Sequence, residues 1–474
     1  MLIGRQNEVR NLREAMEKDS SQLIAVCGRW RAGKTFLIRE VFQNTFTFQH
    51  SGAYNTKKET QLFLFYESLL DAGLPKSEPQ PQNWFDAFAL LKAVVRGSSQ
   101  KKKVLFLDEL SWMDTPKSDL VPALEHFWNA WASARKDIIM ILCSSATSWM
   151  ISRIVHNKGG LYNRLTGRID LEPLSLAQCR QFVQVRNLGL SDSQILELYM
   201  VLGGIPFYWE QLQRGYSVAQ NIDFLFFRPD APLKEEFRHL FSSTFKRPEP
   251  YEKIVMALAG HRQGLTRNEL LGMTRLTGSG TFTRYLQELE SGGFICEYHG
   301  YGKKRKDGLY QLTDPFVLFH HHFVSKSTQD SHYWSNQIHT PAFDTWCGLS
   351  FELVCLLHVE QLKRGLGIQG VITDVCSFSC KADPDAGVRG SQIDLMLDRA
   401  DRVINLVEIK YTQGELTITK SMAEEIRTKR SDFRTVTRSK SAIHITIVTP
   451  FGLKWNSYAG EVQSQLTLEN LFED

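Results

Sequence analysis

Short, continuously apolar runs alternate with amphipathic stretches over the first third of the chain. The runs are residues 22–28, 102–110 and 137–145, and each is rich in Val, Ile and Leu. Apolar runs of this length are typical of strands that are covered on both faces, as in a parallel α/β sheet. The polar, proline-bearing stretch 74–84 interrupts this region and predicts a surface loop. The pattern therefore predicts an α/β domain over 1–168.

The rest of the chain changes pattern twice. Over 169–245 it is helical, and Ser191 is expected to cap one helix, which the glycines at 203–204 end. Over 246–328, three helical stretches precede two short strands around a polar turn, which is the element order of a winged helix. The last part, 329–474, reads helix, three strands, helix and strand. We therefore predict an α/β multidomain chain with four domains.

Composition narrows the class of protein. With 42% hydrophobic and 23% charged residues, the 474-residue chain is neither wholly disordered nor collagen-like. No stretch approaches the roughly 18 apolar residues of a membrane span, and the N-terminus does not resemble a signal peptide. The eight scattered cysteines suit reduced thiols. We expect a cytoplasmic protein with no membrane segment.

One segment carries phosphate-binding chemistry. Residues 28–35 fit the P-loop pattern G-x-x-x-x-G-K-[ST], with an apolar strand before it and a helical stretch after it. Glycines let backbone N–H groups turn toward phosphate oxygens, while Lys34 is expected to reach the terminal phosphates and Thr35 to hold Mg²⁺. The alternative is a glycine turn before an ordinary helix. The predicted nucleotide-binding residues here are Gly28, Arg29, Trp30, Arg31, Ala32, Gly33, Lys34, Thr35 and Phe36.

A second element ends the apolar run 104–110 with two carboxylates. Asp108 is placed to bind Mg²⁺, directly or through water, and Glu109 can polarise the attacking water as a general base. The alternative is an exposed strand end that is acidic by chance. Because both elements lie at strand ends and in this order, they predict a nucleotide-triphosphate-binding domain.

The first half of the chain resembles the AAA+-type ATPase family that is widespread in archaea and bacteria, in the same broad group as the STAND ATPases. The resemblance rests on LIGRQNEV, the arginine-flanked P-loop, FLDELSWMD, ILCSSATSWM, LYNRLTGRIDLEPLS and GGIPFYW. It implies a P-loop ATPase core with a helical lid, ATP and Mg²⁺ as ligands, and a homo-oligomer. Trp30 departs from the family's more usual arginine.

The resemblance also assigns roles to individual residues. Gly4 and Arg5 fall in the segment that lies near the adenine in the family. Ser144 or Ser145 would contact the γ-phosphate or the attacking water.

Two arginines lie in the segment before the lid. Arg164 or Arg168 would serve as an arginine finger or a nucleotide sensor. The alternative for both is a surface arginine in a loop.

A group of charged residues interrupts two apolar strands near the C-terminus. Residues 391–412 contain these strands, with a polar turn between them. Asp394 lies on the first strand, and Glu408 and Lys410 lie two apart on the second, so the latter two share a face. A hairpin would bring Asp394 close to them. Two carboxylates make a hard-oxygen Mg²⁺ site, and a neighbouring lysine can orient a water or steady a phosphate.

This spacing resembles the PD-(D/E)XK nuclease superfamily, and Glu352 takes the place of the acidic residue that this superfamily often carries on its first helix. The resemblance implies a restriction-endonuclease-like α/β domain over 329–474, with Glu352, Asp394, Glu408 and Lys410 catalytic and the two strand carboxylates as metal ligands. A structural salt bridge on a hairpin is one alternative. A nuclease fold that has lost cleavage is another.

The densest charge run of the sequence is GKKRKDG at 302–308, at the expected wing tip of the winged helix. A basic wing can lie against phosphates with little regard to sequence. Arg284 is the one obvious contact on the expected recognition helix, whereas Glu288 and Glu290 would repel DNA. The alternative is a winged helix used for protein packing. The predicted DNA-binding residues are Arg284, Lys303, Lys304, Arg305 and Lys306.

The leading hypothesis is a cytoplasmic ATPase that couples nucleotide state to DNA binding or to metal-dependent DNA cleavage, in defence or in mobile-DNA processing. The runner-up is a regulatory switch of the STAND kind. In that case the C-terminal domain would bind a protein or DNA partner without cleaving it.

Overall fold

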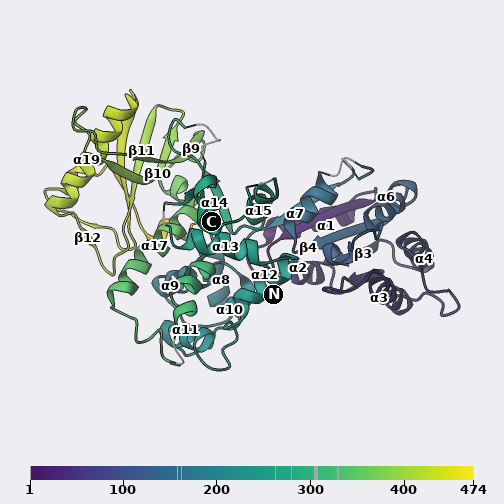
Figure 1. Ribbon diagram of the computed structural model, residues 1–474. Helices are drawn as coiled ribbons and strands as arrows, with labels where there is room; N and C mark the ends of the chain where they lie inside the picture. Colours follow the sequence, from purple (N-terminus) through teal and green to yellow (C-terminus); the bar gives the residue numbers. More distant parts are fainter. Residues whose placement is uncertain are drawn as a thin grey trace. The chain divides into compact units, whose positions relative to one another are not determined.

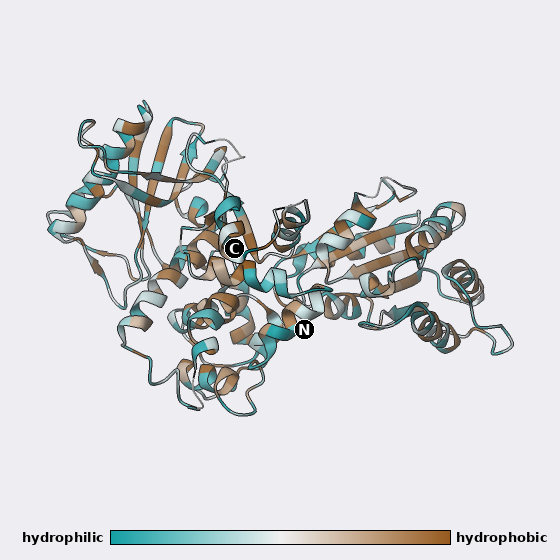
Figure 2. Cartoon of the chain, viewed as in Figure 1, coloured by the Kyte–Doolittle hydropathy of each residue, from teal (hydrophilic) through white to brown (hydrophobic). Residues whose placement is uncertain are grey.

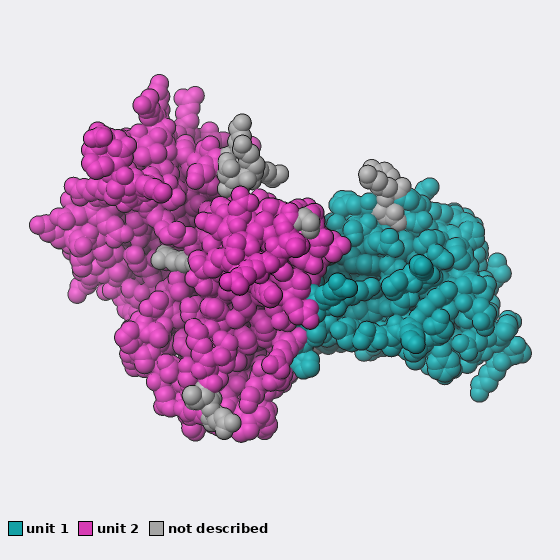
Figure 3. All heavy atoms as spheres, viewed as in Figure 1, with its two compact units in different colours: residues 1–173, 239–248 teal, residues 174–238, 249–474 magenta. Residues whose placement is uncertain are grey.

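The computed structural model describes residues 2–156, 159–161, 163–261, 263–278, 280–303, 308–327 and 330–473 (Figure 1). These residues divide into two compact units, which Figure 3 colours separately. The first unit is Met1–Pro173 with His239–Pro248, and the second is Leu174–Arg238 with Glu249–Asp474. The division into four domains stays a prediction.

A parallel sheet with the strand order β2-β3-β4-β1-β5 forms the centre of the first unit. Its strands are β1 (Gln22–Gly28), β2 (Phe48–Ser51), β3 (Lys103–Asp108), β4 (Ile138–Ser144) and β5 (Gly167–Leu171). The predicted parallel α/β sheet is thus confirmed, and its three predicted strands are β1, β3 and β4. Because the strands are parallel, their carboxyl ends meet at one edge, where Gly28, Asp108 and Ser144 lie.

Helices cover both faces of this sheet. They are α1 (Gln6–Glu17), α2 (Lys34–Val41), α3 (Lys58–Asp71), α4 (Trp84–Gly97), α5 (Leu110–Met113), α6 (Leu120–Ala130) and α7 (Thr147–Met150), with a 3₁₀ segment (Ala132–Ala134) and a π-helical segment (Ile151–Val155). On β1, Leu23 and Ala25 pack with α3, α4 and α6, whereas Ile24 and Val26 pack with α1 and α2. The strand is therefore apolar from Leu23 to Cys27, and brown prevails in the strands of Figure 2. The predicted loop joins α3 to α4.

The second unit begins with a helical region. Its helices are α8 (Leu176–Val185), α9 (Asp192–Leu202), α10 (Pro206–Glu210), α11 (Val218–Phe226) and α12 (Glu236–Thr244), the last of which runs on into residues assigned to the first unit. The Ser191 side chain accepts a hydrogen bond from the Gln194 backbone amide, and the Gln194 side chain accepts one from the Ser191 backbone amide. The predicted cap of α9 is therefore confirmed, and it is a capping box. Gly203 ends α9 with a φ of +59°, a conformation that favours glycine.

Helices and a hairpin follow in the predicted order. The elements are α13 (Glu249–Ala259), β6 (Leu265–Thr266), α14 (Arg267–Thr274), α15 (Gly280–Ser291), β7 (Ile295–Tyr298), β8 (Leu309–Leu312), α16 (Pro315–His322) and a 3₁₀ segment (Val324–Lys326). The strands form a small antiparallel sheet in the order β6-β8-β7. Thr266 caps α14 in a capping box with Glu269. Buried Leu270, Phe282 and Leu286 hold α14 and α15 to the region's core.

A mixed sheet with the order β15-β13-β11-β10-β9 organises the C-terminal part of the second unit. The elements are α17 (Pro341–Leu357), α18 (Val359–Gly365), β9 (Thr373–Cys380), β10 (Ser391–Arg399), β11 (Val403–Ile409), β12 (Leu416–Thr417), α19 (Lys420–Thr437), β13 (Ala442–Val448), β14 (Leu453–Lys454), a 3₁₀ segment (Ala459–Glu461), β15 (Ser464–Leu466) and α20 (Leu468–Leu471). Strands β9, β10 and β11 are antiparallel, whereas β13 and β15 join parallel. Ile426 and Phe433 of α19 pack on one sheet face.

Two further features are the absence of a membrane-spanning helix among the described residues and the state of the cysteines. Among the described residues, no single helix is long and apolar enough to cross a membrane, and only the bent pair α17 and α18, at 76°, passes by length and composition together. All eight cysteines are free thiols. Burial raises the pKa of Cys27 and of Cys376 to about 12, so both are inert thiols near neutral pH.

Candidate nucleotide-binding and catalytic sites

The predicted P-loop connects the end of β1 to the start of α2. Gly28 has a φ of +151°, and a Cβ there would lie 2.7 Å from the Leu171 carbonyl oxygen, so no larger residue fits. Gly33, with a φ of +89°, occupies the N-cap of α2. The loop therefore turns tightly into a helix N-terminus, whose free N–H groups favour phosphate.

Lys34 lies at the centre of this loop and is 5% exposed. Its amine donates hydrogen bonds to the carbonyl oxygens of Gly28 at 2.8 Å and Arg29 at 2.9 Å, and to the Ser145 hydroxyl at 3.0 Å. These contacts use all three donors of the ammonium group. A terminal phosphate that binds here must therefore replace at least one of them.

Thr35 and Asp108 bring two hard oxygen ligands together. The Thr35 hydroxyl donates to Asp108 Oδ2 at 2.6 Å, and the Glu109 amide donates to Asp108 Oδ1 at 3.0 Å. Asp108 ends β3 and is 6% exposed. A hydroxyl beside a buried carboxylate at a phosphate loop has the donor chemistry that Mg²⁺ requires. The residues present thus fit the ion that the sequence predicts.

Glu109 lies directly after β3 in a left-handed conformation, with a φ of +46°. Such backbone is costly for a residue with a side chain and recurs at functional sites. The Glu109 carboxylate accepts hydrogen bonds from the hydroxyl and the amide of Ser145, at 2.5 and 3.1 Å. Burial raises the pKa of Glu109, while Lys34 and Ser145 partly oppose the rise. The carboxylate is therefore a stronger base than an exposed glutamate.

The other predicted loop residues have mixed surroundings. Arg29 and Ala32 are buried, and Arg31 adopts a left-handed backbone with a φ of +64°. The Trp30 ring packs against Trp112 at a centroid distance of 5.7 Å. The Phe36 side chain is exposed.

Ser145 rather than Ser144 contacts the P-loop lysine. The Ser144 hydroxyl is fully buried and donates to the Ser111 hydroxyl at 2.9 Å, while it accepts from the Ala146 amide. The two serines were open alternatives in the sequence, because both follow the apolar run of β4. In this structure Ser145, and not Ser144, lies beside Lys34.

The predicted adenine-segment and arginine residues take separate positions. Gly4 has a φ of +64°, and the Arg5 guanidinium donates to the Glu172 carbonyl oxygen at 2.7 Å. Arg168 lies on β5 and forms an ion pair with Asp170 at 2.8 Å, whereas the Arg164 side chain is exposed. The Arg168 charge is thus already paired within its own strand.

A family comparison bears on this site. Residues 2–212 match the model of a family described as an ATPase domain predominantly from Archaea. This part of the chain is similar to that ATPase domain. The match includes the P-loop, both carboxylates at the end of β3, and helices α8, α9 and α10.

Individual relatives cover a longer stretch at low identity. An uncharacterized protein of Methanocaldococcus jannaschii is 24% identical over 328 residues, 68% of this chain and 69% of that protein. A Walker-type ATPase of Pyrococcus abyssi has 17% identity and a TM-score of 0.45, over 67% of this chain and 95% of its own. The ORC2 protein of Aeropyrum pernix has 16% identity and a TM-score of 0.32, over 75% and 95%.

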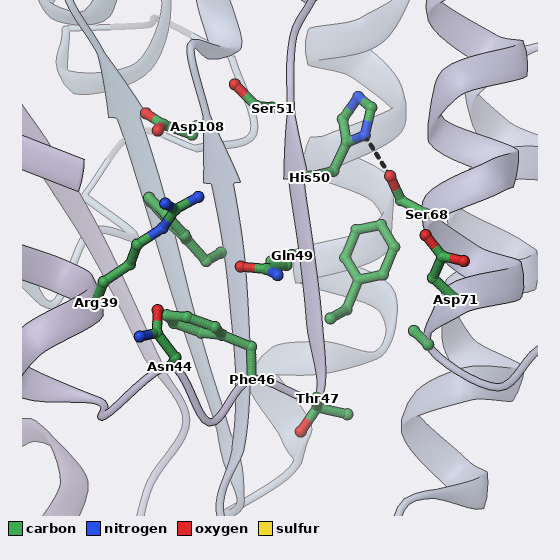
Figure 4. Close-up of a pocket in the computed structure, with 13 residues that line it drawn as sticks. Arg39, Asn44, Phe46, Thr47, Gln49, His50, Ser51, Ser68, Asp71 and Asp108 are labelled. Carbon is green, nitrogen blue, oxygen red and sulfur yellow. Dashed lines mark hydrogen bonds between the residues drawn. The ribbon is translucent and has the colours of Figure 1, made fainter. Parts of the chain in front are cut away.

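The first unit also carries a cavity of about 390 Å³ beside its edge strand β2 (Figure 4). Most of its lining is polar and comes from β2, α2, α3 and the end of β3. His50 contacts the Ser68 hydroxyl at 2.9 Å, and burial lowers the pKa of His50 to about 4. Asp108 lines the cavity as well as the phosphate site. No sequence motif predicted this hollow, since β2 is short and carries no pattern of its own.

The charged group near the C-terminus of the chain is an ion-pair network. Leu395 of β10 lies opposite Val407 of β11, so Asp394 and Glu408 come next along the hairpin. Glu408 Oε1 lies 2.8 Å from Lys410 Nζ, and Oε2 lies 2.7 Å from Lys429 Nζ of α19. Burial raises the pKa of Glu408, but the two lysines outweigh this effect and hold the pKa below its usual value.

The residues that contact one another in this network are not the set that the sequence predicts for a metal site. Asp394 accepts a hydrogen bond from the Gln392 side chain. Among the described residues, no three His, Cys, Asp or Glu side chains are grouped to hold a metal, so Glu352 on α17 does not complete such a group. Lys429, which the sequence did not single out, contacts Glu408 instead. The metal and catalytic roles of Glu352, Asp394, Glu408 and Lys410 stay predictions.

The predicted DNA-binding residues fall partly outside the described part of the chain. Lys304, Arg305 and Lys306 lie outside the described residues, whereas Lys303 is described and exposed. Arg284 on α15 is 62% exposed and lies 3.8 Å from Glu288. Its charge is thus partly balanced within its own helix.

Proposed function

We propose that the protein hydrolyses ATP and that its nucleotide state controls how the second unit acts on DNA. One observation carries the ATPase half of this proposal. Lys34, Ser145 and Glu109 form a continuous chain of hydrogen bonds beside the Thr35–Asp108 pair, at the carboxyl edge of a parallel sheet. This is the position where open α/β sheets bind ligands.

Each of these residues has a separate task in hydrolysis. Lys34 neutralises the terminal phosphates, and the Thr35 hydroxyl and the Asp108 carboxylate hold Mg²⁺. Bound Mg²⁺ supplies charge stabilisation to the phosphoryl oxygens. Glu109 takes the proton of the attacking water, for which its raised pKa is an advantage. Ser145 holds the Glu109 carboxylate in place.

The remaining predicted nucleotide contacts are part of this proposal. Gly4 and Arg5 would lie near the adenine. Arg164 suits an arginine finger better than Arg168, because its side chain is exposed while Arg168 pairs with Asp170. An exposed finger would act on the nucleotide of a neighbouring copy, which agrees with the homo-oligomer expected for such ATPases.

The DNA half of the proposal rests on residues 246–328 as a winged helix. Three helices and a β6-β8-β7 sheet support this reading, with Lys303 at the exposed edge of the wing. Glu288 and Glu290 on α15 disfavour reading of base edges. We therefore infer phosphate contacts that depend on salt and little on sequence.

A second candidate function is metal-dependent DNA cleavage by the C-terminal domain. The order α17, β9, β10, β11, α19, β13 agrees with the nuclease-like domain inferred from the sequence. Asp394 and Glu408, which come next after the paired Leu395 and Val407, would supply two carboxylates for Mg²⁺. Each carboxylate oxygen of Glu408 contacts one lysine, so one of these two contacts would have to break before the oxygen could bind the ion. Without that exchange, the domain would be a non-cleaving partner-binding module, as in a STAND-type switch.

One experiment separates these possibilities. The full-length protein is incubated with plasmid and linear DNA, in Mg²⁺ or Mn²⁺, with and without ATP. DNA binding that responds to ATP and is lost in Lys34→Ala, but kept in the loop control Lys76→Ala, supports the coupled ATPase. Cleavage that is lost in Asp394→Ala supports the nuclease. Binding without cleavage in either metal supports the switch, and absence of DNA binding contradicts the DNA half of the proposal.

The wing has a test of its own. Replacing Lys303, Lys304, Arg305 and Lys306 by serine should weaken DNA binding and reduce the slope of log affinity against log salt by up to about four phosphate contacts. An unchanged slope would mean that this tip is solvated and takes no part in binding.

A further inference from the structure

A cavity of about 370 Å³ lies within the second unit, apart from the phosphate site. Its walls come from α9, α11, the segment before α17, α17 itself, and the turns that follow β11 and β13. A hollow of this size suits one small molecule. Neither the family match nor any motif of the sequence assigns a ligand to it.

One wall of this cavity is aromatic and rigid. The rings of Trp334 and Trp346 meet edge to face, with centroids 5.2 Å apart, and Phe343 packs on Trp334 at 5.4 Å. Trp334 and Trp346 are almost fully buried, so their rings are fixed by packing. Tyr411 completes the aromatic lining from the β11 side. The faces of aromatic rings carry negative charge density.

Glu197 of α9 places a carboxylate in the same lining. Among the described residues, none forms a hydrogen bond or an ion pair with the Glu197 side chain, and no lysine or arginine lines the cavity. Burial raises the pKa of Glu197, and its charge, after burial, raises the pKa of Cys347 and of Tyr411. A carboxylate, a thiol and a phenol therefore line one cavity, and the basic side chain that the described lining offers them is the exposed His339.

We propose that this cavity binds a small organic cation, whose charged group pairs with Glu197 and whose apolar body lies against Trp334, Trp346 and Tyr411. An aromatic wall attracts cations through its ring faces, and a partly desolvated carboxylate adds a direct charge pair. An anion would be repelled by Glu197 and would find no lysine or arginine in the described lining, only the exposed His339 as a basic side chain. A bare divalent metal ion would find one carboxylate where several ligands are required.

Three ligands of one shape and different charge test this proposal on the full-length protein. Phenethylammonium carries a positive charge, 2-phenylethanol is neutral and phenylacetate is negative, while all three keep the same ring. We expect calorimetry to give at least tenfold tighter binding of the ammonium than of the alcohol, and no binding of the acid. Agmatine and choline extend the series to guanidinium and quaternary ammonium groups.

Two variants assign the binding to the cavity. Glu197→Gln should remove the preference for phenethylammonium over 2-phenylethanol, because only the charge is lost, and Tyr411→Leu should weaken the cation severalfold while keeping its preference. Glu210→Gln changes an exposed glutamate of α10 outside the cavity and should leave binding unchanged. Equal binding of the cation and the alcohol, a Glu197→Gln variant with unchanged affinity, or no binding of any of the three cations would overturn the proposal.

Discussion

Glu109 and Ser145 are joined by two hydrogen bonds, one to the hydroxyl and one to the amide of the serine, at 2.5 and 3.1 Å. The same hydroxyl accepts a hydrogen bond from Lys34. The P-loop lysine and the proposed base are therefore linked through one side chain. Any phosphate that draws Lys34 away from Ser145 also changes the surroundings of Glu109.

The first prediction separates ATP binding from hydrolysis. Glu109→Gln should bind ATP as the wild type does and lose at least about a hundredfold in hydrolysis rate, because only the general base is removed. Phosphate release measures the rate, and a fluorescent nucleotide measures binding. Equal hydrolysis by the two proteins would end the assignment of Glu109 as the base.

The second prediction concerns Ser145. Ser145→Ala should slow hydrolysis by about tenfold, less than Glu109→Gln, because the base keeps the Ser145 amide but loses the hydroxyl donor. Since the hydrogen bond of the Ser145 side chain lowers the pKa of Glu109, its loss should move the acid limb of the rate profile to higher pH. Ser152→Ala, at an exposed position near α7, is the matched control. A merely structural role would lower stability and leave the pH profile where it was.

The phosphate site was largely predictable because its motif dictates local geometry. Gly28 and Gly33 are required by backbone angles and a close approach, and Lys34 and Thr35 follow them at fixed positions. The choice between Ser144 and Ser145 was not predictable. The two serines are adjacent and chemically identical, and they differ in which neighbour their hydroxyls contact. That contact depends on how the backbone turns at the end of β4, which tertiary packing determines.

The C-terminal hairpin also has a contact that depends on tertiary packing and could not be predicted from the sequence. Alternation along the strands was enough to predict β10 and β11, which pair in antiparallel up to Leu395 and Val407. Lys429 lies 21 residues after Glu408 on a different element, and only the packing of α19 on the sheet brings it to 2.7 Å. A contact of this kind leaves no periodic signal in one sequence.

The third prediction tests how much the Lys429–Glu408 ion pair contributes to the free energy of unfolding. Lys429→Ala should lower the free energy of unfolding by about 3 kcal/mol, because Glu408 would keep a mostly buried charge with one partner fewer. Arg238→Ala removes an exposed partner of Glu235 and should change stability by less than about 1 kcal/mol. Urea unfolding of the full-length protein measures both variants. Similar small effects for the two would show that Lys429 is not needed for the fold.

The fourth prediction follows from the sign of the Glu408 shift. Because Lys429 and Lys410 hold the pKa of Glu408 below its usual value, the ion pair stabilises the fold above the unfolded-state pKa of glutamate, about 4.3. That stability should be lost as pH falls through the lower folded-state pKa. Glu408→Gln should lose stability near pH 7 and show a flatter acid limb in unfolding experiments between pH 7 and pH 3. A wild-type acid limb in this variant would mean that other carboxylates carry the effect.

The last prediction decides whether this cluster is a metal centre. In the full-length Lys34→Ala variant, which lacks the P-loop lysine, Mn²⁺ should still bind if Asp394 and Glu408 form a second site. A further Asp394→Ala or Glu408→Ala change should remove that binding, since each deletes a carboxylate ligand. Lys410→Ala should spare the metal and lose DNA cleavage, because the lysine acts on water or phosphate and not on the ion. A structural ion pair demands the reverse. In that case Glu408→Ala and Lys410→Ala would each lower the melting temperature, because each removes an ion pair from the network, and calorimetry would detect no Mn²⁺ that depends on Asp394.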